Sequence, residues 1–308
     1  MPRVEFTQRL HEARAWGSAL ERQRNALAEA GIEVGYATVR GLRLRYGWRA
    51  GQGMPLLLCN GIGANMELAL PLVREMPGVP VLLFDIPGTG GSPPAWVWPS
   101  YSQYARYAVG LLDVLGLRGP FAVAGVSWGG GLAQRIALDY RERVRGMILM
   151  ATSPGVIMVP GRVSALLRMT TPQRYLSRSY MARNAAAIYG GEMRGRPDRA
   201  IAFAGMTRAP EPRTYLQQLL AILSFSSLPW LHRVRCPALV MTGDDDPLVR
   251  PVNARILAAL LPRGRLHVVA GGGHLFLALQ PQHSGATILE FLRGLAQDER
   301  PGTQNPPD

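Results

Sequence analysis

Three residues in this 308-residue chain have the types and the order needed for nucleophilic catalysis: Ser127, Asp246 and His274. A serine hydroxyl is a poor nucleophile near neutral pH, so a histidine must accept its proton. A carboxylate must in turn hold that histidine in the correct tautomer and stabilise the imidazolium that forms. The sequence therefore suggests acyl transfer through a serine, provided that the fold brings the three side chains together.

The surroundings of Ser127 indicate which elements position it. The serine stands in a Gly-x-Ser-x-Gly sequence, Gly125 to Gly129, between an apolar run at 121–124 and a helical pattern at 130–138. Strand, sharp turn and helix form the nucleophile elbow of α/β-hydrolases, in which both glycines allow strand and helix to approach closely. We therefore predict an α/β-hydrolase fold, with a mostly parallel central sheet and helices on both faces.

The acid of this fold follows the nucleophile in the chain, and the histidine follows the acid. Three consecutive aspartates, Asp244, Asp245 and Asp246, come after the strand pattern at 237–242. We favour Asp246 as the acid because it lies three residues after the glycine that ends the strand. The proline at position 247 also restricts the backbone of Asp246. Asp244 and Asp245 are interpreted as solvated turn residues or caps.

Only one of the five histidines, His274, lies just beyond a strand pattern, which covers 265–269. Ligands in open α/β sheets bind at the carboxyl ends of strands, where we expect both Asp246 and His274. The default interpretation of a lone histidine is a structural role. We apply it to the remaining four, which are His11, His232, His267 and His283.

The oxyanion of an acyl transfer reaction needs backbone N–H donors, and two positions are predicted to supply them. One is Trp128, the residue after the nucleophile. The other is Ile62, in the glycine- and asparagine-rich loop at 60–65 that follows the strand pattern at 55–59. An ordinary turn would also favour this composition. Losing one such donor typically costs about 10²–10³ in rate.

The pattern of elements predicts one α/β domain with an inserted cap. Strand patterns near 33–40 and 42–49 indicate a hairpin at the edge of the sheet, and alternation of strands and helices continues to about residue 153. The alternation stops in an apolar stretch that we predict to be a helical cap inserted after the sixth strand. The predicted parts are an amphipathic helical extension at 1–31, the core at 32–153 and 231–298, the cap at 154–230 and a disordered tail at 299–308.

Composition excludes several classes of function. No apolar run reaches transmembrane length, and the N-terminus has no apolar segment typical of a signal peptide. No Cys/His cluster has metal-ligand spacing, so neither a metal nor another cofactor is predicted. Cys59 and Cys236 are expected to be buried free thiols. The net charge is +13, and arginine supplies all 34 of the Lys and Arg residues. We expect these arginines to lie on solvated faces or, as the alternative, to contact an anionic surface, and we expect no binding of nucleic acid.

Several stretches resemble the intracellular poly(3-hydroxyalkanoate) depolymerases of the medium-chain-length type, over about residues 38–296. The stretches that carry the resemblance are 60–68, 125–129, 159–161, 189–191, 230–232, 243–248 and 273–277. The resemblance implies a serine hydrolase of a stored polyester with Ser127, Asp246 and His274 in their catalytic roles. It also implies a cytoplasmic enzyme at granule surfaces. The chain departs from the family in its first thirty or so residues and in the glycines before His274.

Three rival interpretations remain at this point. A small-molecule carboxylesterase or lactonase would use the same triad with another pocket. Hydrolysis of carbon–carbon bonds is also catalysed by this triad in capped relatives. A non-catalytic receptor or granule-binding protein could share the fold. Dehalogenases and epoxide hydrolases are excluded because they need aspartate where this chain has Ser127.

Overall fold

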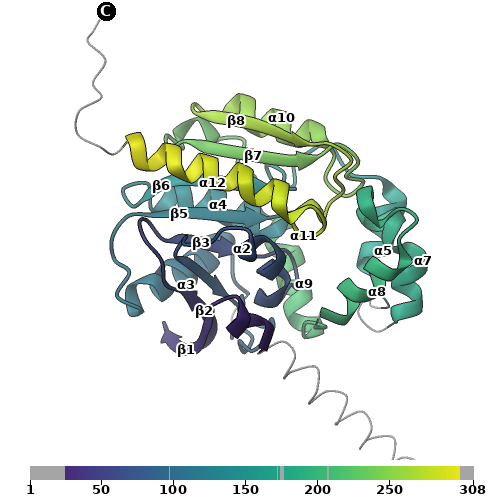
Figure 1. The fold of residues 1–308 in the computed structure, drawn as a ribbon, viewed down its shortest axis with the longest axis horizontal. Coiled ribbons are helices and arrows are strands. Elements are labelled where there is room, and N and C mark those ends of the chain that lie inside the picture. The colour runs from purple at the N-terminus through teal and green to yellow at the C-terminus, as the bar shows by residue number, and fades with distance from the viewer. Residues whose placement is uncertain (1–24, 97, 172, 174–176, 207, 299–308) are drawn as a thin grey trace, which may run out of the picture.

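A computed structural model describes residues 25–298 apart from 97, 172, 174–176 and 207. Its centre is an eight-stranded sheet with the order β1-β2-β4-β3-β5-β6-β7-β8. β2 runs antiparallel to both neighbours, and the pairs from β4 to β8 are parallel, so the predicted fold class is confirmed (Figure 1). The strands are Glu33–Val39 (β1), Leu42–Arg49 (β2), Leu56–Cys59 (β3), Val81–Phe84 (β4), Phe121–Val126 (β5), Val144–Met150 (β6), Ala238–Gly243 (β7) and Gly264–Val269 (β8).

Helices cover both faces of the sheet because its central strands are apolar on both sides. Successive side chains of a strand point to opposite faces. Leu57 accordingly packs in one buried cluster, and Leu56 and Leu58 pack in the other. The helices of the core are Leu70–Arg74 (α2), Tyr101–Val114 (α3), Trp128–Asp139 (α4), Pro251–Leu260 (α10), Phe276–Leu279 (α11) and Pro281–Asp298 (α12), with the short 3₁₀ turns Met66–Ala69 (η1) and Leu231–Arg233 (η3).

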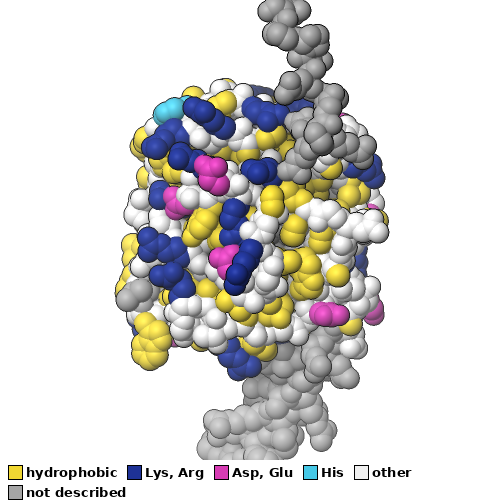
Figure 2. Space-filling model, turned by 90° about the vertical axis from the view of Figure 1, so that its left-hand side faces the viewer, with side chains coloured by type: hydrophobic (Ala, Val, Ile, Leu, Met, Phe, Trp, Pro, Cys, Tyr) yellow, Lys and Arg dark blue, Asp and Glu magenta, His cyan; other side chains and the backbone are white. Residues whose placement is uncertain are grey.

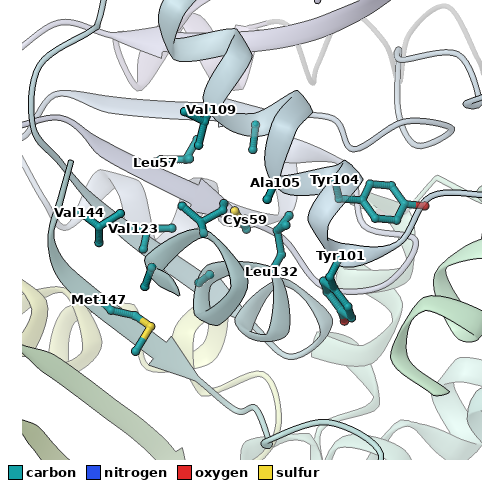
Figure 3. Close-up of a cluster of buried hydrophobic side chains, with 14 of the residues drawn as sticks. Leu57, Cys59, Tyr101, Tyr104, Ala105, Val109, Val123, Leu132, Val144 and Met147 are labelled. Carbon is teal, nitrogen blue, oxygen red and sulfur yellow. The ribbon is translucent and has the colours of Figure 1, made fainter. Parts of the chain in front are cut away.

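The first cluster lies between the sheet and α3, α4 and α10 (Figure 3). In it Val109 of α3 and Leu132 of α4 meet Leu57 and Val123 of the sheet. The second cluster lies under α2, α11 and α12 on the other face. The first cluster fixes α4, and with it the residue that precedes α4, against the centre of the sheet.

The helical extension and the tail that we predict at the two ends of the chain lie largely outside the described residues. Of the extension predicted at 1–31, only its last part is described. Residues 25–29 are helical, and Leu27 is fully buried in the second cluster. The tail predicted at 299–308 lies outside the described residues.

Between β6 and β7 the alternation of strands and helices gives way to a helical cap. Its elements are Val163–Thr170 (α5), Arg178–Tyr189 (α7), Gly191–Met193 (η2), Pro197–Met206 (α8) and Pro212–Leu223 (α9). The cap has a small apolar cluster of its own, in which Met181, Ile188 and Tyr189 pack with Leu248 of the core. The helices α5, α7 and α8 stand beyond the ends of the strands, at the right of Figure 1.

The surface and the cysteines complete the description. Figure 2 shows the side away from α5, α7 and α8, where arginines are scattered and acidic side chains are fewer. Within the described ranges, no helix combines the length and the apolar character needed to cross a bilayer.

Cys59 is a buried free thiol, and its burial raises the pKa of the thiol. The expectation of burial is wrong in part for Cys236, which stays partly exposed because it precedes β7 at the margin of the sheet.

Candidate active site

Ser127 occupies a strained turn between β5 and α4. Its φ of 53° and ψ of −116° lie outside the regions that residues with a side chain ordinarily adopt. Two hydrogen bonds hold the turn: the Ser127 N–H donates to the Met150 carbonyl at 2.8 Å, and the Thr152 hydroxyl donates to the Ser127 carbonyl at 2.6 Å. A Cβ on Gly125 would collide with the backbone of Gly129, which explains the glycine at that position.

Asp246 and His274 form a buried pair beyond the ends of β7 and β8. His274 Nδ1 lies 2.8 Å from Asp246 Oδ2, and the two side chains are 7% and 0% exposed. The other carboxylate oxygen, Oδ1, accepts the backbone N–H groups of Leu248 at 2.8 Å and Val249 at 2.9 Å. These donors fix the carboxylate, so Oδ2 has a single partner and the imidazole has a defined orientation.

The loop after β3 is a tight turn in which some backbone N–H groups are bonded to described residues and the N–H of Ile62 is not. The Ala64 N–H donates to the Gly61 carbonyl, and the Asn60 side chain closes the loop on the Asn65 carbonyl at 3.1 Å. The Gly63 N–H donates to Gln218 Oε1 at 2.7 Å. Among the described residues, the Ile62 N–H has no hydrogen-bond acceptor.

Trp128 starts α4, so its backbone N–H has no acceptor within the helix. Its indole is fixed by a hydrogen bond from Nε1 to the Gln218 carbonyl at 2.8 Å and by stacking on Tyr101, with ring centroids 4.7 Å apart. Gln218 of α9 therefore contacts both the loop after β3 and the residue after Ser127. Nothing in the local sequence predicted this contact, because 90 residues separate Gln218 from Trp128.

A single cavity brings Ser127, His274 and the loop after β3 together, whereas Asp246 lies behind His274. In the part of the chain that the structure describes, no hydrogen bond joins Ser127 Oγ to His274. Such contacts often tighten only when substrate binds. The rest of the lining is apolar and comes from both core and cap, including Leu68, Met169, Met181, Tyr189, Phe203, Leu275 and Leu277.

A buried ionic network, which no local sequence pattern predicted, supports the loop after β3. Arg45 binds Glu67 Oε1 at 2.8 Å and Asp85 Oδ2 at 3.0 Å. Asn65 Nδ2 donates to the other oxygen of Glu67 at 2.7 Å, which ties the network to the end of the loop. Burial works against ionised Glu67, but Arg45 outweighs it and holds the pKa of Glu67 below its usual range. The residues of this network lie far apart in the sequence, so they form no recognisable motif.

Asp245 lies in a turn and is partly exposed, but it also binds the cap, which was not predicted. Its carboxylate binds Arg194 of the cap through two hydrogen bonds of 2.6 and 2.8 Å and accepts the Gly191 N–H at 2.7 Å. The adjacent Tyr189 carbonyl accepts the His274 N–H at 2.7 Å. The sequence did not predict the contact with Arg194, because this partner lies in the cap, 51 residues earlier. Asp244 is exposed, as expected.

The remaining histidines and acids form no second centre in the described ranges. His267 of β8 and His283 of α12 contact each other, with their Nε2 atoms 2.8 Å apart. Burial and the neighbouring imidazole lower the pKa of His267. His232 is exposed, and His11 lies outside the described residues. No group of three or more His, Cys, Asp or Glu side chains in the described part could hold a metal ion.

The fold and the site define a class of protein that comparison with known proteins confirms. The alpha/beta hydrolase fold family is matched over residues 54–281, and the chain belongs to that family. A solved thermophilic esterase from Thermogutta terrifontis superposes with a TM-score of 0.72 at 23% identity, covering 85% of this chain and 99% of the esterase. That similarity supports the fold alone.

Two curated relatives are more similar in sequence. A poly(3-hydroxyalkanoate) depolymerase from Ectopseudomonas oleovorans is 41% identical over 78% of this chain and 84% of its own length. A 2-hydroxymuconate semialdehyde hydrolase from Pseudomonas sp. (strain CF600) is 30% identical over 73% of this chain and 82% of its own length. The first match confirms the resemblance to the depolymerase family and the predicted class of carboxylic ester hydrolase.

Proposed function

We propose that this enzyme cleaves ester bonds of a poly(3-hydroxyalkanoate) through an acyl-enzyme on Ser127, with His274 as the base and Asp246 as the acid of the triad. The observation that carries the proposal is the buried His274–Asp246 pair, 2.8 Å between Nδ1 and Oδ2, whose imidazole shares one cavity with Ser127. A carboxylate bound at Nδ1 leaves Nε2 to accept the serine proton.

The proposed reaction has two halves. Ser127 Oγ attacks the ester carbonyl while His274 accepts its proton, and the backbone N–H groups of Ile62 and Trp128 stabilise the oxyanion. His274 then protonates the leaving hydroxyl, which leaves a 3-hydroxyacyl ester on Ser127. Water deprotonated by His274 attacks this ester and releases a 3-hydroxyalkanoic acid or an oligomer. The unused N–H of Ile62 and the free first N–H of α4 support these assignments.

The proposed substrate rests on the 41% identical relative and on the lining of the cavity. Met169, Met181, Tyr189 and Phe203 make the cap side of the cavity apolar and adaptable, which suits aliphatic side chains of a polyester. We place the reaction at the surface of a storage granule in the cytoplasm. No cofactor takes part in the proposed mechanism.

The test compares a polyhydroxyalkanoate latex with short and medium p-nitrophenyl esters, using wild type and Ser127→Ala. Clearing of the latex by wild type and not by the variant supports the proposal. Ester cleavage without clearing would replace the polymer by a small ester or lactone. Turnover by a folded Ser127→Ala protein at the wild-type rate would contradict the assignment of the nucleophile. Turnover of a vinylogous diketone in place of esters would favour carbon–carbon hydrolysis.

A further inference from the structure

The cap helix α9 has its polar and apolar sides reversed. Its outer side presents Leu216, Leu220 and Leu223, which are 47%, 42% and 62% exposed. These residues are spaced by four and three positions, so they form one stripe along the helix. The inner side buries Thr214 and the adjacent glutamines 217 and 218. A helix packed on a core ordinarily shows the opposite arrangement.

The polar inner side is held by the active site. Gln218 accepts the Gly63 N–H through Oε1 and the Trp128 indole N–H through its carbonyl. Both amide atoms of Gln217 and the hydroxyl of Thr214 are buried and have no hydrogen-bond partner among the described residues. Unpaired buried polar atoms cost free energy, and so does apolar surface left in water. Contact of the leucine stripe with an apolar surface would offset the second of these costs.

Segments that contact α9 or the residues just after it expose further apolar side chains. Tyr215 of α9 donates a hydrogen bond to the Met169 carbonyl of α5, a helix that exposes Leu166 and Leu167. At the other end of α9, a bridge between Gly155 and Ser226 brings in the loop that exposes Val156 and Ile157. Arg213 donates to the carbonyl of Trp96, which is 89% exposed. The helix α9 is therefore linked to three segments that carry exposed apolar residues of their own.

We propose that the outer side of α9 is the surface by which the enzyme docks on its water-insoluble polyester, an inference that rests on the proposed function. The occupant follows from continuity with the cavity: α5 lines the cavity with Met169 and carries exposed leucines one turn earlier. α5 thus joins the apolar wall of the cavity to the exposed apolar residues beside α9. The leucine stripe itself is uncharged, which suits an apolar aliphatic surface.

The test separates docking from chemistry. Leu216, Leu220 and Leu223 are replaced together by glutamine in wild type and in Ser127→Ala, and adsorption of the inactive form to polyhydroxyalkanoate latex is measured by co-sedimentation. The control replaces Leu260, Leu266 and Val268 by glutamine, since they are 44%, 39% and 42% exposed on α10 and β8. We expect adsorption and latex clearing to fall by about tenfold or more in the α9 variant only. Hydrolysis of soluble esters should stay unchanged in both.

Several results would overturn the docking proposal. Equal adsorption of wild type and the α9 variant would do so, and so would an equal loss in the control. A wild-type dimer that the α9 substitutions dissociate without a change in adsorption would assign the stripe to a second copy of the chain. Should the triple variant lose soluble-ester turnover through misfolding, Leu223→Gln alone, at the most exposed position, must still reduce adsorption. Failure of wild type to clear the latex, with adsorption intact and dependent on α9, would reject polymer hydrolysis and not docking.

Discussion

Replacing Asp246 by asparagine should abolish most of the activity without unfolding the protein, because the substitution changes the tautomer of His274. In wild type, Oδ1 accepts the N–H groups of Leu248 and Val249, and Oδ2 faces His274 Nδ1. An asparagine that keeps both backbone donors must place its oxygen at the Oδ1 position. Its NH₂ group then faces Nδ1 and turns that nitrogen into an acceptor, so the proton moves to Nε2. His274 in this tautomer cannot accept the serine proton.

The structure also sets the free-energy cost of flipping the asparagine amide, which would restore the active tautomer of His274. The flipped amide would point its NH₂ group at the buried N–H group of Leu248 and the partly buried N–H group of Val249. Each unpaired donor costs about 1–3 kcal/mol, so the flipped form is disfavoured by about 2–6 kcal/mol. Each 1.4 kcal/mol corresponds to about a tenfold change in population, which makes the flipped form about 30-fold to 10⁴-fold rarer. We therefore expect kcat to fall by about 10⁴, the loss typical of this change in a triad.

The assay is steady-state hydrolysis of a soluble p-nitrophenyl ester, with thermal unfolding as the check on folding. KM should change little, because Asp246 does not line the cavity. Asp244→Asn is the matched control, since this neighbouring carboxylate is exposed, and it should keep wild-type kcat. A folded Asp246→Asn enzyme with kcat within about tenfold of wild type would refute the reasoning.

Three further predictions concern stability. Gly125→Ala should lower the free energy of unfolding by about 1–3 kcal/mol, because the new Cβ meets the Gly129 backbone, whereas Gly119→Ala, in open space, should be nearly neutral in the same denaturant titration. Arg45→Met should cost about 3–5 kcal/mol because it leaves Glu67 and Asp85 buried without their cation. Arg43→Met, at an exposed position of β2, should cost less than about 1 kcal/mol, and equal losses would contradict the role of the network. The hydrogen bond from Arg194 lowers the pKa of Asp245, and the opposing effect of burial is smaller. The stability that ionised Asp245 contributes is therefore complete above the usual aspartate pKa and is lost as pH falls through the lowered value. The difference in Tm between wild type and Asp245→Asn should thus be present near neutral pH and vanish in strong acid; a difference independent of pH would contradict this.

The fold could be predicted because its signals are local. The fully apolar runs of β3, β4 and β5 are typical of parallel strands buried on both faces. Gly125 follows from the close contact of β5 with α4, and Gly129 follows from the close contact of α4 with the end of β3. The hairpin of β1 and β2 was predicted within a residue of its observed bounds for the same reason.

The features that the sequence did not predict are contacts between distant segments. Arg45, Glu67 and Asp85 look like ordinary surface charges until the sheet brings β2, η1 and the end of β4 together. Asp245 has turn-forming neighbours, and only the cap supplies Arg194. The amphipathic pattern of α9 is visible in the sequence, but the rule that apolar sides face inward gives the wrong orientation here. Gln218 determines which side of α9 faces inward, because it binds the loop after β3 and Trp128.

The most direct test of the central claim is to trap the intermediate on Ser127. Rapid mixing with a p-nitrophenyl 3-hydroxyalkanoate, acid quench and peptide mass spectrometry should give a burst of p-nitrophenol and a 3-hydroxyacyl adduct on the peptide that contains Ser127. Ser127→Ala should show neither the burst nor the adduct. An adduct on another residue, or turnover by the alanine variant at the wild-type rate, would contradict the account.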